Sequence, residues 1–252
     1  MEEYKSSKQR VLEILNSKTD IEKIEKIPNN DDEFTYENGI KSWVCAMFID
    51  IRNSTRYFKS ESMSYDCKAR VLRAFTSEVI NILASETSYR EIGIRGDCVY
   101  GIFSTPKLTD VKQIIHLAAK INSFNNMFQR ILENNNFCTF DIGIGIGLSE
   151  DLIIKAGKYG TGISDKIWLG NAVVDASNLS KYGNKYNNSS NIKYPTILIS
   201  SCYMHNIEEF KANDNQKYSE LFEKYNVDYG TTCYGCNLVN ISWDEWFDNG
   251  MR

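Results

Sequence analysis

The stretch CAMFIDIRNSTRYF, residues 45–58, decides the fold expected for this chain. A mostly apolar run ends on Asp50, one more apolar residue follows, and a polar turn then leads into a segment of helical character. Such a run is typical of a buried strand. A carboxylate at the end of a buried strand needs a partner, because an unpaired buried charge is costly. The sequence therefore raises the question of what Asp50 binds.

The composition limits the class of protein. The chain has 252 residues, of which 42% are hydrophobic and 25% charged, and its formal net charge is −4. These values indicate a globular protein with a sizeable core. A mildly acidic surface does not favour nucleic acid or an anionic membrane as a partner. No apolar run reaches the roughly 20 residues that span a bilayer, so we expect a cytoplasmic protein without direct membrane contact.

Apolar periodicity and breaking residues divide the chain into helices and strands. Helices are expected at 3–27, 63–85, 109–133, 171–183 and 205–224. Strands are expected at 42–50, 89–94, 98–103, 137–149, 152–160, 166–170, 196–200 and near 231–241. This order predicts an α+β fold with a mostly antiparallel, ferredoxin-like sheet and flanking helices.

The same pattern suggests three parts. Residues 1–40 are predicted to form a helical lead-in outside the main core, because Pro28 and a polar stretch interrupt the apolar pattern. Residues 41–205 are expected to form the main domain. Residues 206–252 are less regular and are expected to complete or cap that domain.

Two acidic residues are expected to meet at one end of this sheet. Asp50 ends the first strand, and Asp97 lies in a tight turn between the next two strands. In a ferredoxin-like sheet, a strand and a hairpin joined through one long helix commonly lie side by side. Neighbouring carboxylates repel unless a cation lies between them. A pair of Mg²⁺ or Mn²⁺ ions would relieve this repulsion and would suit chemistry at phosphorus.

The polar turn after Asp50 fits the same chemistry. Asn53, Ser54 and Thr55 are favoured at the start of a helix, where free backbone N–H groups bind phosphate. We therefore expect these three residues to contact a phosphorylated substrate. The alternative is that Asp50 is a helix cap and Asp97 an ordinary turn residue, and spacing by itself leaves both interpretations open.

Four blocks of the sequence, in order, resemble class III nucleotidyl cyclases. FIDIRNST (48–55) is similar to the first metal motif of that family, and RGDCVYGIF (95–103) is similar to the second. GIGIGLS (143–149) with IIKAGKYG (153–160) resembles the paired strands, and WLGNAVVDASNLS (168–180) resembles the last active-site helix. The resemblance covers roughly residues 42–200.

The resemblance implies a homodimer with active sites at the interface. It implies two divalent metal ions, Mg²⁺ or Mn²⁺, held by Asp50, Asp97 and the carbonyl of Ile51. It also implies cyclisation of a nucleoside triphosphate, in which the 3′-hydroxyl attacks the α-phosphorus in line and pyrophosphate leaves.

The base-reading positions depart from the purine cyclases. Gly93 stands where adenylate cyclases of the family carry a lysine, and an ungapped match puts Ile167 at their second base-reading position. Neither side chain can hydrogen-bond adenine, and a site built to pair with one base edge rejects others strongly.

The helix motif departs as well. Val174 replaces the asparagine that orients the ribose, and Asn178 replaces the arginine that stabilises the transition state. A cationic group usually supplies part of that stabilisation. Candidates for a substitute donor are Arg52, Arg56, Lys155 and Lys181.

This combination resembles the pyrimidine cyclases of the bacterial Pycsar anti-phage system. The likeness rests on GIRGDCVYGIF (93–103) and IWLGNAVVDASNLS (167–180). It implies conversion of UTP, or CTP, to the 3′,5′-cyclic monophosphate, which acts on a separate effector protein. Arg95 and Tyr57 are further candidates for contact with this substrate.

Two alternatives remain open. The first is an adenylate cyclase with unusual base contacts, which Gly93 and Ile167 disfavour. The second is a non-catalytic cyclase-like module that binds a nucleotide and signals, which the intact Asp50 and Asp97 disfavour.

Overall fold

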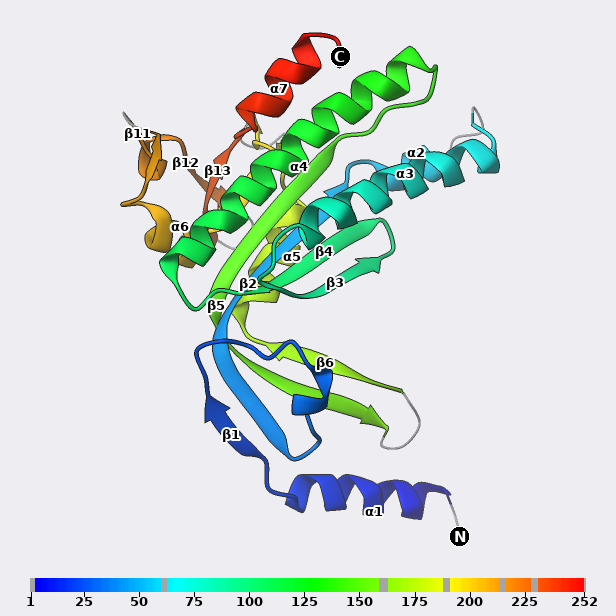
Figure 1. Ribbon diagram of the computed structural model, residues 1–252. Helices are drawn as coiled ribbons and strands as arrows, with labels where there is room; N and C mark the ends of the chain where they lie inside the picture. Colours follow the sequence, from blue (N-terminus) through cyan, green and yellow to red (C-terminus); the bar gives the residue numbers. More distant parts are fainter. Residues whose placement is uncertain are drawn as a thin grey trace.

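The computed structural model describes residues 3–59, 63–158, 163–187, 191–213, 216–227 and 231–251. Seven strands of its main sheet follow the order β12-β13-β9-β5-β2-β4-β3, and β1 and β6 pair with β2 and β5 (Figure 1). These strands are β1 (Asp20–Lys23), β2 (Asn38–Ile51), β3 (Tyr89–Arg95), β4 (Cys98–Ser104), β5 (Ile142–Lys158), β6 (Ile163–Leu169), β9 (Ile197–Ser200), β12 (Glu223–Val227) and β13 (Thr231–Cys236). Pairing is antiparallel except between β1 and β2 and between β5 and β9. The predicted α+β class with a mostly antiparallel sheet is confirmed.

Helices cover both faces of this sheet. Helices α3 (Tyr65–Ala84) and α4 (Leu108–Asn134) pack on one face, and α5 (Asn171–Ser180) packs on the other (Figure 1). The remaining elements are α1 (Glu3–Asn16), α2 (Ser54–Lys59), α6 (Ser201–Ile207), α7 (Ile241–Asp248), and the short strands β7 (Tyr186–Asn187), β8 (Ile192–Lys193), β10 (Lys211–Asn213) and β11 (Gln216–Lys217). In the described part of the chain, no helix is long and apolar enough to cross a bilayer.

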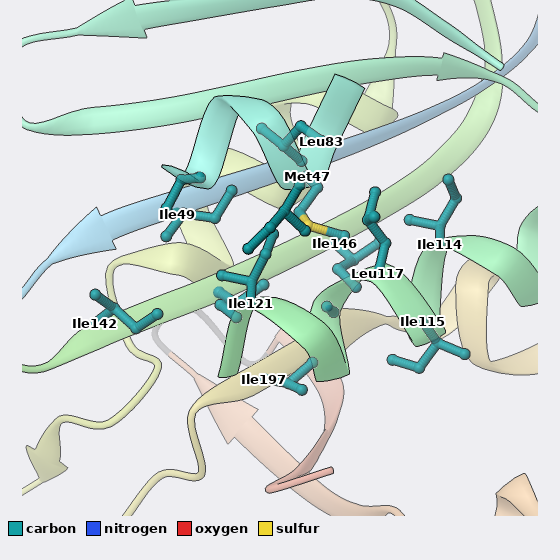
Figure 2. Close-up of a cluster of buried hydrophobic side chains, with 14 of the residues drawn as sticks. Met47, Ile49, Leu83, Ile114, Ile115, Leu117, Ile121, Ile142, Ile146 and Ile197 are labelled. Carbon is teal, nitrogen blue, oxygen red and sulfur yellow. The ribbon is translucent and has the colours of Figure 1, made fainter. Parts of the chain in front are cut away.

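The side chains on the two faces of β2 belong to two different apolar clusters. Met47 and Ile49 are fully buried on the side of α3 and α4, whereas Val44 and Ala46 are fully buried on the side of α5. Figure 2 shows Met47 and Ile49 among apolar side chains of both helices and of β5. Burial of each such side chain contributes about 1.5–3 kcal/mol, so this central strand and its terminal carboxylate are firmly placed.

The two strands expected at 137–149 and 152–160 are one strand. β5 runs without a break from Ile142 to Lys158, pairing first with β2 and, in its second half, also with β6. The charged pair Glu150-Asp151 resembles a turn in the sequence. In the structure Glu150 forms ion pairs with Lys23 and Lys41, and Asp151 is fully buried against the start of α5. Both charges are therefore accommodated within a continuous strand.

The helix expected at 3–27 ends at Asn16. Residues 20–23 instead form β1, which pairs in parallel with the start of β2. Ile27 and Phe34 are buried with Ile40 in the cluster beneath α5, so part of the expected lead-in packs on the sheet. The division of the chain at residue 40 stays a prediction.

The helix expected at 205–224 is also wrong. α6 spans only residues 201–207, and short strands and a 3₁₀ turn (Tyr218–Glu220) follow it. β12 and β13 then add two strands to the edge of the main sheet beside β9, and α7 packs on α4. The described residues after α6 thus extend the sheet and cover part of its helical layer. The boundary at residue 206 stays a prediction.

A row of glycines lets α5 lie directly on β5. A Cβ atom on Gly145 would lie 2.1 Å from the carbonyl oxygen of Ala176, and one on Gly147 would lie 2.2 Å from that of Ala172. A Cβ on Gly143 would meet the carbonyl of Ser180 at 2.4 Å. The glycines of the GIGIG segment therefore permit the close backbone approach that fixes α5 on the sheet.

Candidate active site

The structure places Asp50 and Asp97 at the same end of the sheet. Asp50 lies opposite Cys98 in the pairing of β2 with β4, and Asp97 immediately precedes Cys98 in the turn from β3. Gly96 supplies the left-handed backbone of that turn, with φ of 63°. Burial raises the pKa of Asp50, Arg52 opposes that rise, and the charge of Asp97 adds to it. The two carboxylates therefore repel each other, and a divalent cation between them would relieve this repulsion.

This donor set fits a hard divalent cation. Two carboxylates meet at a sheet end that is only partly exposed. Burial raises the pKa of Asp50 and the charge of Asp97 adds to this rise, and a cation would favour the ionised form of both groups. Ile51 follows Asp50 at the end of β2 and lines a cavity together with it. The assignment of Asp50, Asp97 and the Ile51 carbonyl as metal ligands stays a prediction.

Arg52 ties the metal side of the site to α5. Its guanidinium donates to Asp50 Oδ2 at 2.5 Å, to the carbonyl of Ser180 at 2.6 Å and to that of Lys181 at 2.6 Å. The side chain is only 11% exposed. These hydrogen bonds join the end of β2 to the C-terminal end of α5.

The turn after Arg52 has the shape expected of an anion-binding turn. Asn53 adopts a left-handed backbone with φ of 54°, and α2 begins at Ser54. Asn53 and Ser54 both line a cavity next to Asp50. The side chains of Thr55 and Arg56 lie outside the described part of the chain.

Tyr57 lies in the core. It is 8% exposed, its ring packs edge-on against Phe140, and its hydroxyl donates to the carbonyl of Cys138 at 3.4 Å. Burial raises its pKa to about 12. The structure therefore surrounds Tyr57 with packing contacts, and its expected contact with the substrate stays a prediction.

The cavity beside Asp50 has a volume of about 910 Å³ and an unexpected basic wall. Opposite the end of β2 it is lined by Asn184, Lys185, Tyr186 and Lys193, which belong to the β7–β8 hairpin and the turn before it. Lys59 lines it from the end of α2. Lys185 and Lys193 were not predicted from the sequence, because they follow the last motif and carry no spacing signal of their own.

Gly93 faces a tyrosine that leaves no room for a side chain. A Cβ on Gly93 would lie 2.5 Å from the Tyr100 ring, which stacks on Phe48 with centroids 5.2 Å apart. The Tyr100 hydroxyl donates to Glu91 at 2.7 Å, and the other oxygen of Glu91 accepts from the Trp168 indole at 2.8 Å. The position at which related cyclases read adenine is therefore filled from a neighbouring strand.

Trp168, rather than Ile167, is linked through Glu91 to the Tyr100 ring that covers Gly93. The two residues are neighbours on β6, so their side chains project to opposite faces. Ile167 is 42% exposed, whereas Trp168 packs against the cluster beneath α5. Arg95 is exposed at the end of β3, and its positive charge opposes the rise that burial and Glu91 cause in the pKa of the Tyr100 hydroxyl. The expected contacts of Gly93, Arg95 and Ile167 with the base stay predictions.

Asn178 does not line the Asp50 cavity. It is exposed on α5, where its side-chain oxygen accepts from Lys181 at 3.3 Å, and it borders a separate cavity of about 480 Å³. Val174, one turn earlier on the same helix, is 53% exposed. In one chain these two residues face solvent, so they reach an active site only if another chain brings one to them.

The fold and the paired carboxylates are those of a class III nucleotidyl cyclase domain. The crystal structure of the guanylyl cyclase Cya2 matches with a TM-score of 0.59 at 13% identity, covering 80% of this chain and 95% of that chain. A uridylate cyclase from Treponema porcinum is 38% identical over 249 residues, which cover 99% of this chain and 82% of that protein. The chain belongs to the uridylate cyclase family.

A second relative supports this assignment. A uridylate cyclase from Gulbenkiania mobilis is 29% identical over 254 residues, covering 97% of this chain and 95% of that protein. No protein-family model matches the chain.

Proposed function

We propose that this protein converts UTP to 3′,5′-cyclic UMP and pyrophosphate. The observation that carries the proposal is the register of β2 against β4, which brings Asp50 beside the turn that holds Asp97. The uridylate cyclase from Treponema porcinum supports UTP over CTP as the substrate. The cyclic nucleotide would serve anti-phage defence by acting on a separate effector protein.

The reaction exchanges one phosphorus–oxygen bond for another. The ribose 3′-hydroxyl gives up its proton to solvent, and its oxygen bonds to the α-phosphorus as the bond from that phosphorus to the bridging oxygen breaks; pyrophosphate keeps the electron pair of the broken bond. Two divalent ions, Mg²⁺ or Mn²⁺, held by Asp50, Asp97 and the Ile51 carbonyl would make the 3′-hydroxyl more acidic and offset phosphate charge. Asn53, Ser54 and Thr55 would orient the triphosphate through backbone N–H groups.

The base side of the site supports a pyrimidine rather than adenine. Tyr100 fills the space over Gly93 and is fixed by Glu91, so no side chain can extend from Gly93 to a purine edge. Arg95, which lies beside the Tyr100 hydroxyl, is a cationic donor on the same side of the site. Arg95 and Ile167 would border the base from the two sides of a homodimer interface.

The proposal is tested by product identification. Purified protein is incubated with Mn²⁺ and, separately, ATP, GTP, CTP or UTP, and products are identified by mass spectrometry. We expect cyclic UMP as the main product and its loss in Asp97→Ala. Cyclic AMP as the main product would contradict the assignment, and nucleotide binding without any turnover would indicate a non-catalytic module.

A further inference from the structure

The cavity beside Asp50 carries an excess of positive charge. Four cationic side chains line it, namely Arg52, Lys59, Lys185 and Lys193, against two carboxylates, Asp50 and Asp141. The whole chain has a net charge of −4. A basic wall in an acidic protein, facing a carboxylate at the end of a strand, is a site for an anion that binds together with a cation.

Arg52 is not available to this anion. Its guanidinium is already bonded to Asp50 and to the carbonyls of Ser180 and Lys181, and it is mostly buried. If it turned towards a ligand, it would leave those buried acceptors unpaired, at a cost of about 1–3 kcal/mol each. The positive charge that a ligand can recruit therefore comes from the lysines.

Lys185 and Lys193 are exposed and lack a carboxylate partner. Across the described ranges, no Asp or Glu oxygen lies within 4.0 Å of either ammonium group. The Lys185 ammonium lies 5.9 Å from the centroid of the Tyr182 ring, which does not neutralise it. Asp141, the other carboxylate that lines the cavity, accepts a hydrogen bond from the Gln129 side chain at 3.2 Å.

The backbone holds both lysines in place. The Lys185 N–H donates to the carbonyl of Tyr182 at 2.9 Å, and its carbonyl accepts from the N–H of Tyr194 at 2.9 Å. Lys193 pairs with Tyr186 between β7 and β8, and Lys185 directly precedes Tyr186. Both lysines line the cavity, so two ammonium groups are available to one ligand from backbone that is held by hydrogen bonds.

We propose that Lys185 and Lys193 bind the β- and γ-phosphates of the triphosphate and stabilise pyrophosphate as it leaves. Negative charge accumulates on the leaving pyrophosphate as the bond to the α-phosphorus breaks, and fixed cations lower the energy of that transition state. Asn178 carries no charge and lies on another cavity, so these lysines supply the cationic stabilisation on the side of Asp50. This inference rests on the proposed cyclase function.

The test begins with steady-state kinetics on UTP and Mn²⁺. Lys185→Ala and Lys193→Ala should each lower kcat/KM by about tenfold, and the double variant by about a hundredfold, because each loses a charge-assisted contact to phosphate. The decrease should fall partly on kcat, since the contact strengthens in the transition state. Lys185→Arg and Lys193→Arg should keep most of the activity. Lys224→Ala, which removes an exposed lysine of β12, is the matched control and should leave activity unchanged.

A binding measurement separates this inference from the proposed function. Isothermal titration with inorganic tripolyphosphate and Mn²⁺ should show affinity about tenfold or more weaker in the double alanine variant, with unchanged thermal melting. If the wild-type protein makes no cyclic nucleotide but shows this difference, the cyclase function fails and the phosphate site stands. If it makes cyclic UMP and the lysine variants match it within about twofold, the inference is overturned and the function stands.

Discussion

At the scale of single residues, the Tyr100 ring excludes a side chain at position 93. Its ring covers Gly93, and its hydroxyl is held by Glu91, which Trp168 holds in turn. The chain Tyr100–Glu91–Trp168 joins β4, β3 and β6, three strands that are not all adjacent. If Gly93 borders the base as predicted, that side of the site depends on several strands, and we expect that one changed residue does not convert it into an adenine site.

Gly93→Lys tests this conclusion. The new side chain collides with Tyr100, and we expect loss of cyclic UMP production by about tenfold or more, since overpacking of this kind typically costs about 1–3 kcal/mol. No cyclic AMP should replace it, as shown by mass spectrometry with each triphosphate. Ile94→Lys, at an exposed position of the same strand, should keep most of the activity. Efficient cyclic AMP synthesis by Gly93→Lys would show that Tyr100 does not control base choice.

Arg52→Ala should destabilise the protein in a way that metal partly reverses. Removing the guanidinium leaves the half-buried Asp50 facing Asp97 without a counter-charge, and about 3 kcal/mol of unfolding free energy should be lost. Urea unfolding with and without Mn²⁺ measures this loss, which should shrink when Mn²⁺ is present. Arg73→Ala, an exposed position on α3, should cost almost nothing. A loss that is equal with and without Mn²⁺ would argue against metal at Asp50.

Only part of this residue-level detail could be predicted from the sequence. The meeting of Asp50 and Asp97 follows from strand order, because each lies at the end of a strand in one hairpin-rich sheet. The hydrogen bond from Trp168 to Glu91 could not be predicted, because it depends on which face of β6 lies towards the end of β3. The contact of Ile167 with the base stays a prediction. Lys185 and Lys193 were missed because their closeness to Asp50 depends on how α5 ends, which no local pattern records.

At the scale of elements, the close contact between α5 and β5 depends on glycine at the positions of β5 that face the helix. Gly145→Ala would place a methyl group inside the backbone of α5, and neither backbone can move without breaking sheet or helix bonds. We expect at least about 3 kcal/mol of lost stability and loss of activity, measured by urea unfolding and by product formation. Ile144→Val, on the opposite face of the same strand, should cost only about 1 kcal/mol and keep activity. Equal effects of the two changes would contradict the packing argument.

The buried Asp151 should make the stability of α5 depend on pH. Burial raises its pKa, against the hydrogen bonds it accepts from Ser149 and from the first N–H groups of α5. The folded chain therefore binds a proton more readily than the unfolded chain, so this group favours folding below its ordinary pKa of about 4 and loses that contribution as pH rises through the raised value. Asp151→Asn removes the effect.

The measurement is the melting temperature of Asp151→Asn relative to the wild type between pH 4 and pH 8. The variant should gain relative stability as pH rises. Asp165→Asn, on the exposed part of β6, should show no such trend. A constant difference between wild type and Asp151→Asn would contradict the raised pKa.

Helices and strands could be predicted from the sequence where their apolar periodicity and turn residues lie within one short segment. The helices near 63–85 and 109–133 and the hairpin around Gly96 agree with the structure within a few residues. β5 was divided in two because Glu150 and Asp151 look like a turn, and their partners Lys23, Lys41 and α5 lie far away in the sequence. The strand β1 was taken for helix because its pairing with β2 overrides its helical periodicity.

At the scale of the whole molecule, a homodimer would bury an apolar face that one chain exposes. Leu169 and Val174, from β6 and α5, are 47% and 53% exposed. We expect that Leu169→Glu with Val174→Glu converts a dimer into a monomer in analytical ultracentrifugation and abolishes cyclic UMP synthesis, because each site would lose residues of the partner. Ile241→Glu, on α7 at the other face, should leave a dimer with full activity. An active monomer would contradict the proposed interface.

The order of strands in the sheet also determines at what stage of its synthesis the chain can fold into an active form. A ribosome releases β2 early, but its neighbour β5 starts only at Ile142, and α5, which lies on the glycines of β5, comes later still. Pairing between segments so far apart is slow, and the apolar side chains of β2 wait without their partners. A nascent chain therefore carries both acidic residues long before it can assemble a working site. Translation itself therefore delays the onset of activity until α5 has been made.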